Sequence, residues 1–236
     1  MCLVFIAYRL ERSTPVLIGA NREESRSRPT TSPVCCRSGP LRCLLAGADH
    51  GPDGRFPEMG TWLGVNEAGM AVEVTNRSDG ELAWEDQTRS RGLLAVAMLG
   101  CDRPELAARM ARAELASGGF GGCNYLIAGR GAAYVVQAPG AGRVAVLELP
   151  PGIHAMTNLD LDDAGDPRIR FVAGHLDPAD FPASAGRICR DARIIIAGGD
   201  RGTISSSLVR IGEPIELQHI RGDPRGRDYE PWRLPD

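Results

Sequence analysis

The chain of 236 residues is long enough for one large domain or two small ones, and its 43% hydrophobic residues allow a sizeable core. A net charge of −3 argues against a protein that binds nucleic acid or an anionic membrane surface. No apolar run approaches the roughly 20 residues that span a bilayer. The amino terminus also lacks a signal-peptide pattern, so we expect a cytoplasmic protein without a transmembrane segment.

The first eight residues place a cysteine directly ahead of an apolar run with β-branched and aromatic members, a pattern that predicts a strand. Because Cys2 is small, removal of Met1 would leave a thiol and a free α-amine on one residue. An α-amine has an ordinary pKa of about 8. It can therefore accept a proton near neutral pH and activate the thiol as a nucleophile. The alternative is that Cys2 only begins a buried strand.

The next stretch predicts a hairpin, with strands over 2–10 and 15–20 joined by a polar turn. The polar run Asn21-Arg22-Glu23-Glu24 follows the second strand, so it should lie beside the amino terminus. A carboxylate and a guanidinium there would pair with the ammonium and the thiolate of Cys2. A solvated charged turn is the alternative interpretation.

Residues 25–58 are rich in Arg, Ser, Pro and Gly, and they predict a loop with one short strand at 44–47. Cys35, Cys36 and Cys43 cluster in this region near His50. Adjacent cysteines do not easily share one tetrahedral ion, so we expect no metal site. The seven cysteines of the chain follow no framework spacing, and most should be reduced and buried.

Another hairpin is predicted over 60–76, where apolar positions alternate on both sides of a turn, and Asn76 closes its second strand. Two helices are predicted next, over 90–100 and 104–117. Asp102 is the expected cap of the second helix, and glycines end it.

The remaining elements repeat this alternation of strands and helices. They are strands at 124–128, 132–137, 143–149 and 152–158, helices at 168–176 and about 186–197, and a hairpin of 203–211 with 214–221. Asn158 closes the last of the four strands. The order predicts an α+β fold of antiparallel sheets with helices on their outer faces. We expect a single domain over 1–221 and an irregular tail over 222–236.

Short motifs are spread over most of the chain. In order they are Met1-Cys2, Asn21-Arg22-Glu23-Glu24, Gly60-Thr61-Trp62-Leu63-Gly64-Val65, Thr75-Asn76, Ser90-Arg91-Gly92, Asn124-Tyr125-Leu126, Pro151-Gly152-Ile153-His154 and Thr157-Asn158. Together they resemble the NRDE family, also called the transport and Golgi organisation protein 2 family. Two positions depart from the family pattern. Glu23 replaces an aspartate, and Ile204 stands where the family tends to have an arginine, so Arg201 or Arg210 would have to serve instead.

The family in turn resembles the N-terminal-nucleophile hydrolases, in particular cysteine amidases of the penicillin V acylase and bile-salt hydrolase type. This resemblance implies a four-layer αββα sandwich with the nucleophile at the start of the first strand. It also implies a site to which a strand-closing asparagine and a later Thr-Asn pair contribute. Asn76 and Asn158 occupy the matching places in this sequence.

The chemistry expected of such a site starts with attack of the Cys2 sulfur on an acyl carbon while the α-amine carries the proton. The side-chain amide of Asn158 and the backbone N–H of Asn76 would hold the oxyanion. Arg22 would favour the thiolate, and Glu23 or Glu24 would bond the α-ammonium. His154 is a weaker candidate for the base, because a free amine makes it unnecessary.

Two classes of function remain open. The first is an enzyme that cleaves or transfers the acyl group of a small amide, ester or thioester through an acyl-Cys2 intermediate, without a cofactor. The second is a binding or trafficking protein on the same fold, since haem handling and acyl-CoA or lipid handling have been suggested for the family. The sequence has no Cys-Pro haem motif and no evident axial histidine pair, so haem rests on the resemblance alone.

Overall fold

The computed structural model describes residues 2–28, 30–49, 60–80, 86–140 and 142–235. The chain forms two compact units, one of Met1–Arg28 with Pro150–Arg233 and the other of Pro29–Leu149 with Leu234–Asp236. The single domain expected over 1–221 stays a prediction. Among the described residues, no helix is both long and apolar enough to cross a membrane.

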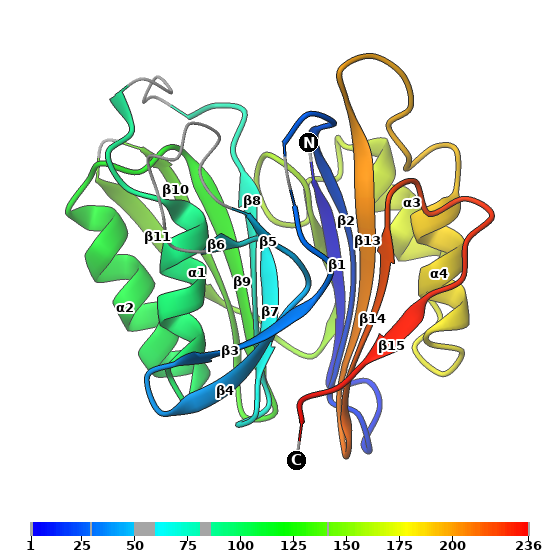
Figure 1. Cartoon of the computed structure of the whole chain (residues 1–236), viewed down its shortest axis with the longest axis horizontal. Coiled ribbons are helices and arrows are strands. Elements are labelled where there is room, and N and C mark those ends of the chain that lie inside the picture. The colour runs from blue at the N-terminus through cyan, green and yellow to red at the C-terminus, as the bar shows by residue number, and fades with distance from the viewer. Residues whose placement is uncertain (1, 29, 50–59, 81–85, 141, 236) are drawn as a thin grey trace. The chain divides into compact units, whose positions relative to one another are not determined.

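The first unit contains a six-stranded antiparallel sheet with the order β12-β1-β2-β13-β14-β15 (Figure 1). Its strands are β1 Leu3–Tyr8, β2 Val16–Ser25, β12 Gly152–Met156, β13 Arg201–Ile211, β14 Ile215–Arg221 and β15 Glu230–Trp232. The first and last hairpins are as predicted, but β2 continues through the polar run that the sequence placed after it. The tail also differs from the expectation, because β15 pairs with β14.

Helices α3 Pro167–His175 and α4 Ala183–Arg190 pack on one face of this sheet. Their apolar residues join Leu3 and Phe5 of β1 in one core cluster. Gly19 on β2 has no room for a side chain, since a Cβ there would lie 2.2 Å from the Phe5 ring. Asp166 caps α3 by accepting a hydrogen bond from the Arg168 backbone N–H.

The helix expected over about 186–197 was placed too far along the chain. The observed helix, α4, ends at Arg190, and the backbone of Asp191 is extended. The Asp191 side chain accepts a hydrogen bond from the Arg193 backbone N–H at 2.9 Å. Such a local turn competes with continued helix formation.

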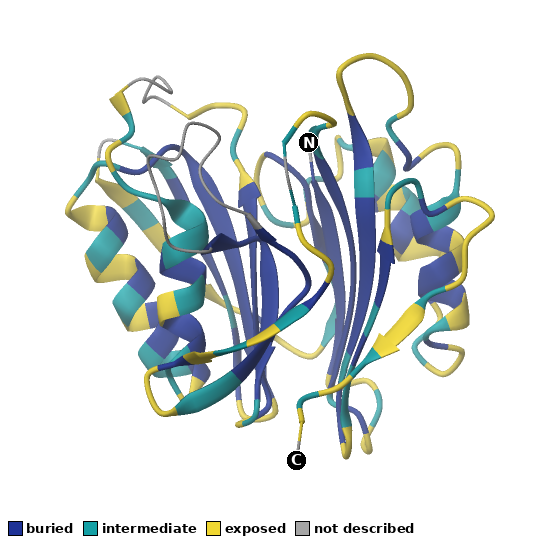
Figure 2. Ribbon diagram, in the orientation of Figure 1, coloured by how far each residue is buried: buried dark blue, intermediate teal, exposed yellow. Residues whose placement is uncertain are grey.

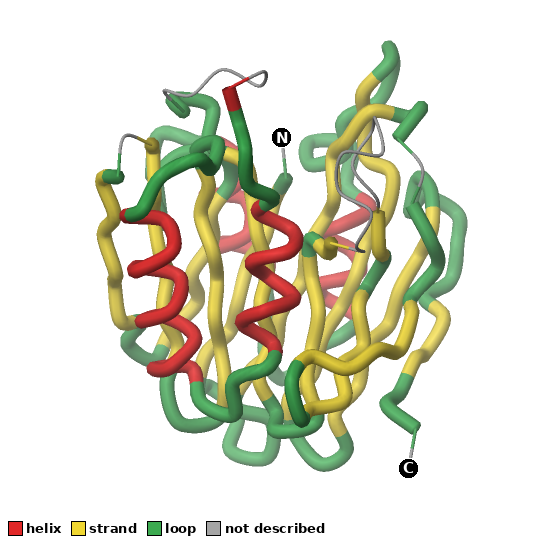
Figure 3. Tube along the Cα trace, turned by 60° about the vertical axis from the view of Figure 1, so that its left-hand side comes forward, coloured by secondary structure: helices red, strands yellow, loops and turns green. Residues whose placement is uncertain are grey.

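The second unit contains a seven-stranded antiparallel sheet with the order β11-β10-β9-β8-β7-β4-β3. Its strands are β3 Val34–Ser38, β4 Leu41–Leu45, β7 Leu63–Asn66, β8 Met70–Asn76, β9 Cys123–Gly129, β10 Ala133–Gly140 and β11 Arg143–Glu148. A separate pair consists of β5 Ala48–Asp49 and β6 Gly60–Thr61. Helices α1 Arg91–Leu99 and α2 Pro104–Ala116 lie side by side on one face of the large sheet (Figure 3).

Two sequence expectations are wrong in this unit. The described residues of 25–58 contain more than the one short strand expected, because β3 and β4 form a hairpin around Gly39, whose φ of +54° suits the tight turn. Residues 29 and 50–58 of that region lie outside the described ranges. The cap of α2 is Arg103 and not Asp102. Arg103 precedes Pro104, and a residue before proline is pushed toward extended backbone, so Arg103 is the cap and the helix begins at Pro104, as predicted.

Burial follows the position of each strand in its sheet (Figure 2). All residues of β1 and β9 are buried, whereas the edge strands β11 and β15 are largely exposed. The central strands of the first unit are therefore enclosed by their neighbours along their whole length. Cys2 lies directly before one of them.

Candidate active site

Cys2 lies between two neighbouring strands. Leu3 pairs with Asn21 on β2, and Val4 pairs with Met156 on β12. Arg22 is the next residue on β2 after Asn21, and Asn158 lies two residues beyond the end of β12, so both are near the end of the sheet at which Cys2 precedes β1. Cys2 is 8% exposed, and its thiol lies 4.0 Å from the carbonyl oxygen of Glu23.

The strand alternation divides the polar run of β2 between the two faces of the sheet. Leu3 packs in the core under α3 and α4, so Cys2 points to the face away from these helices, together with Arg22. Asn21 points to the helix side, where its side-chain amide donates to the carbonyl oxygen of Cys189 at 2.9 Å. The sequence analysis predicted that all four polar residues lie close to Cys2, but it did not assign each of them to a face of the sheet.

Glu24 forms ion pairs with two arginines. Its carboxylate lies 3.1 Å from Arg28 and 3.2 Å from Arg201, and it accepts the Ser25 backbone N–H at 2.8 Å. Burial alone would raise the pKa of Glu24. The hydrogen bond from Ser25 and the charges of the nearby arginines outweigh burial and lower that pKa. Glu24 is thus an ionised anchor for two guanidiniums, which disfavours the expected contact with an α-ammonium.

Glu23 has the opposite character. It is 4% exposed, and its Oε1 accepts a hydrogen bond from the Thr203 hydroxyl at 3.3 Å. Its Oε2 has no hydrogen-bond partner among the described residues. Burial raises the pKa of Glu23 to about 8, against the attraction of Arg168. Glu23 can therefore gain or lose a proton near neutral pH.

The departure at Ile204 falls on an irregularity of β13. The pairing of β13 with β2 shifts between Thr203 and Ser205, so Ile204 is the extra residue of a β-bulge. Of the two arginines that could replace the family's arginine, Arg201 pairs with Glu24. Arg210 lies further along β13, where its partner is Glu216 at 3.3 Å.

The segment that carries Asn158 is tied to the start of α3. Asn158 is buried and lies two residues beyond the end of β12. The preceding Thr157 donates its hydroxyl hydrogen bond to Asp166 at 2.9 Å, and Asp166 pairs with Arg168 at 2.8 Å. These contacts fix the backbone immediately before Asn158.

His154 has a structural role. It faces Ile6, four residues along β1 from Cys2. Its Nδ1 lies 2.7 Å from Asp162, and this hydrogen bond raises the pKa of His154. The imidazole holds the loop after β12.

Sequence reasoning missed a buried pair on the Cys2 side of the sheet. Ser207 pairs with Ala20 of β2, and its Oγ lies 2.8 Å from Nδ1 of His219. Burial and then the charges of Arg22 and Arg221 lower the pKa of His219 to about 4, so its imidazole is neutral at physiological pH. The sequence feature that could have indicated this pair is the run of three serines, Ser205-Ser206-Ser207, inside a predicted strand.

Asn76 belongs to the second unit. It ends β8, as the sequence predicted, and pairs with Cys123 on β9. Its backbone N–H as an oxyanion donor beside Cys2 stays a prediction. Within the described ranges, no group of three histidine, cysteine or acidic side chains is arranged to hold a metal ion, and His50 lies outside those ranges.

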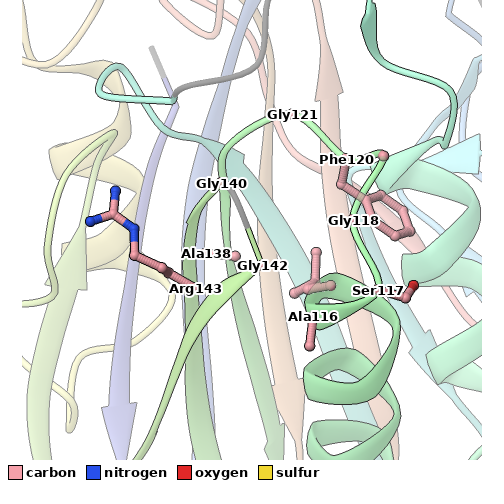
Figure 4. Close-up of a pocket in the computed structure, with 11 residues that line it drawn as sticks. Ala116, Ser117, Gly118, Phe120, Gly121, Ala138, Gly140, Gly142 and Arg143 are labelled. Atoms are coloured by element: carbon pink, nitrogen blue, oxygen red, sulfur yellow. The ribbon is translucent and has the colours of Figure 1, made fainter.

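The second unit also has a small pocket between the end of α2 and the turn of β10 and β11 (Figure 4). Glycines and the backbone after Leu115 form much of its lining, with Phe120 and Ala138. Arg143 is the one charged side chain among the described lining residues. The pocket contains none of the predicted site residues.

Comparison with known proteins places the chain in a family. The family model described as Transport and Golgi organisation 2 matches residues 1–176. A human Transport and Golgi organization protein 2 homolog is 34% identical over 112 residues. That alignment covers 43% of this chain and 36% of the human protein, so it spans little more than a third of that relative.

Solved structures are similar over nearly the whole chain. Penicillin V acylase from Agrobacterium tumefaciens has a TM-score of 0.58 at 13% identity, covering 93% of this chain and 83% of its own. Conjugated bile acid hydrolase from Clostridium perfringens has a TM-score of 0.54 at 11% identity, covering 98% of this chain and 97% of its own. The N-acylethanolamine-hydrolyzing acid amidase ortholog of Caenorhabditis elegans has a TM-score of 0.58 at 15% identity, covering 99% of this chain and 100% of its own.

At these identities the likeness shows the fold alone. The three proteins are N-terminal-nucleophile hydrolases of the αββα class. The fold class expected from the sequence is therefore confirmed, with two antiparallel sheets that each carry a pair of helices.

Proposed function

The chain belongs to the transport and Golgi organisation 2 family, and we propose that it is an N-terminal-cysteine hydrolase or acyltransferase. The substrate would be a small amide, ester or thioester, and the intermediate an acyl group on Cys2. The observation that supports this proposal is the position of Cys2 directly before β1, whose two neighbouring strands lead to Arg22 on β2 and to Asn158 just beyond β12.

The reaction begins after removal of Met1. The freed α-amine takes the thiol proton, and the sulfur attacks the acyl carbon. The positive charge of Arg22, next to Cys2 across β1 and β2, favours the thiolate. The side-chain amide of Asn158 donates to the oxyanion of the tetrahedral intermediate, and one such donor is typically worth about 2.7–4 kcal/mol. The α-ammonium then protonates the leaving group, and water or another nucleophile releases the acyl group.

Glu23 is the better partner of the α-amine. An α-amine is a main-chain group in the plane of the sheet, so its partner does not need to share the face of the Cys2 sulfur. Glu23 follows Arg22 on the paired strand, and its Oε2 has no hydrogen-bond partner among the described residues, so this oxygen remains as an acceptor for the α-ammonium. Glu24 is occupied by Arg28 and Arg201.

The names of the structural neighbours support an acyl substrate. They are an acylase, a hydrolase of conjugated bile acids and an amidase that hydrolyses N-acylethanolamines. All three names describe action on small molecules that carry an acyl group. The same fold therefore accommodates acyl chemistry in each neighbour.

A carrier of haem or of acyl-CoA and other lipids is the second candidate. The observation in its favour is Ile204, which gives the β13 bulge an apolar side chain where the family tends to have arginine. Arg201 does not replace that arginine freely, since it pairs with Glu24.

Mass spectrometry after exposure to acyl amides, acyl thioesters and activated esters separates the two candidates. The enzyme should form an adduct or release a burst of leaving group that disappears in Cys2→Ala. Cys35→Ser is the matched control, because Cys35 is an exposed thiol that can react without a site. Failure of the whole panel to give a Cys2-dependent adduct, together with stoichiometric binding of haem or acyl-CoA, would favour the carrier.

A further inference from the structure

Two cysteines face each other on the β3–β4 hairpin of the second unit. Cys36 and Cys43 are direct partners in the antiparallel register. Both side chains lie on the face that packs against the core under α1 and α2. Cys36 is partly exposed and Cys43 is fully buried, so only the first is open to a reagent from solution.

The thiols also interact with each other. The neighbouring Cys43 thiol holds the pKa of Cys36 below its usual range, and the Cys36 thiol, together with burial, raises the pKa of Cys43. The Cys43 sulfur lies 3.7 Å from the carbonyl oxygens of Leu41 and Leu99. Cys36 is thus suited to attack first, and Cys43 is held beside it.

Neighbouring cysteines do not share this arrangement. Cys35 is next in sequence to Cys36, but it is exposed, and its partner across the hairpin is Leu44. Strand alternation turns Cys35 to the opposite face from Cys43. A bridge between Cys36 and Cys43 is geometrically permitted. Partners in an antiparallel pair have Cα atoms about 4.5–5.5 Å apart, which lies within the span of a disulfide, about 4.4–6.8 Å.

We propose that Cys36 and Cys43 are an oxidative modification site that reacts with low-molecular-weight disulfides of the glutathione type and closes to an intramolecular disulfide. In the first step the Cys36 thiolate attacks one sulfur of glutathione disulfide. The sulfur–sulfur bond of the reagent breaks, a mixed disulfide forms on Cys36, and one glutathione leaves and takes up a proton.

In the second step the Cys43 sulfur attacks the Cys36 sulfur of the mixed disulfide, and the Cys43 proton passes to the departing glutathione. The second glutathione leaves as a thiolate and is protonated. Two protein thiols are oxidised by two electrons in total, and one glutathione disulfide is reduced to two thiols. The new bond would link β3 covalently to β4.

The experiment uses the full chain with Cys2→Ala and Cys35→Ser, so neither the proposed nucleophile nor the exposed neighbouring thiol contributes. This background also makes the result independent of the proposed enzymatic function. The protein is incubated with glutathione disulfide at neutral pH without oxygen, quenched with acid, and analysed by intact mass and peptide mapping. We expect the loss of two hydrogen masses and a peptide in which Cys36 is linked to Cys43.

Two further variants test the order of the steps. In the same background, Cys43→Ser should stop at one glutathione bound to Cys36, because no second thiol is available. Cys36→Ser should leave Cys43 unmodified, since Cys43 is buried. A stable glutathione adduct on Cys36 with Cys43 intact would overturn the proposal, as would a linkage to a different cysteine or complete resistance to the reagent.

Discussion

The side-chain amide of Asn21 donates to the carbonyl oxygen of Cys189 at 2.9 Å and so joins β2 to α4. This contact lies on the helix side of the sheet, whereas the next residue, Arg22, lies on the side of Cys2. Two adjacent residues of one polar motif therefore have different tasks. Asn21 fixes a helix to the sheet, and Arg22 is the residue that we propose favours the thiolate.

Asn21→Ala should destabilise the fold more than it changes the chemistry. The substitution leaves a buried carbonyl oxygen without this donor, which typically costs about 1–3 kcal/mol. Urea unfolding measures the loss, and acylation of Cys2 in the folded fraction measures the chemistry. A variant with unchanged stability and a large loss of acylation would instead give Asn21 a direct part in the reaction.

Processing of the amino terminus is the simplest test of the proposed mechanism. The α-amine of Cys2 is free only if Met1 is removed, so the mature chain should lack the mass of one methionine. Intact-mass measurement of protein purified from its own host decides this. Retention of Met1 on most molecules would remove the base and contradict the hydrolase mechanism.

Cys2 should be the most reactive thiol toward a haloacetamide at mildly acidic pH. An adjacent ammonium and the Arg22 guanidinium both favour the thiolate. Cys36 is the competitor that the structure identifies, since its pKa is also lowered. Labelling is therefore compared in the unsubstituted protein and in Cys36→Ser. An inert Cys2 in both, with label on Cys35 or Cys43, would contradict the site.

Asn158→Ala should separate an enzyme from a carrier. An oxyanion donor acts chiefly on charge that develops in the tetrahedral intermediate, so substrate binding should stay nearly intact. Turnover should fall by roughly 100- to 1,000-fold. Steady-state kinetics on a responsive acyl substrate measures both effects. A change in ligand affinity without any acyl-cysteine would support the carrier.

Glu23 should make the stability of the fold depend on pH. Its pKa is raised in the folded state from 4.5 to about 8, so the folded protein retains a proton that the unfolded chain releases. Its contribution to stability is fully present below about pH 4.5 and declines as pH rises toward about 8. Glu23→Gln should remove this decline. Unfolding curves at a series of pH values for both proteins check it, and parallel pH profiles would refute the raised pKa.

Local patterns were sufficient for several elements. Alternating apolar residues around a turn predicted the hairpin that ends at Asn76, and Asp166 before Pro167 predicted the start of α3. These signals involve residues within a few positions of each other. Only the end of β4 was predicted, as a strand at 44–47, because β3 has a single strongly apolar residue, Val34, and β4 is supported by pairing with β7 from a distant part of the chain.

The sequence by itself determined the α+β class, the position of Cys2 before the first strand, and the set of polar residues near it. Only the tertiary structure decided the face on which each of those residues lies and the partner that each one has. Glu24 pairs with Arg201, Ser207 meets His219, and Cys36 faces Cys43. The physical reason is that these contacts depend on strand register. A shift of one residue turns every side chain of a strand to the other face, and register is set by the packing of the whole sheet.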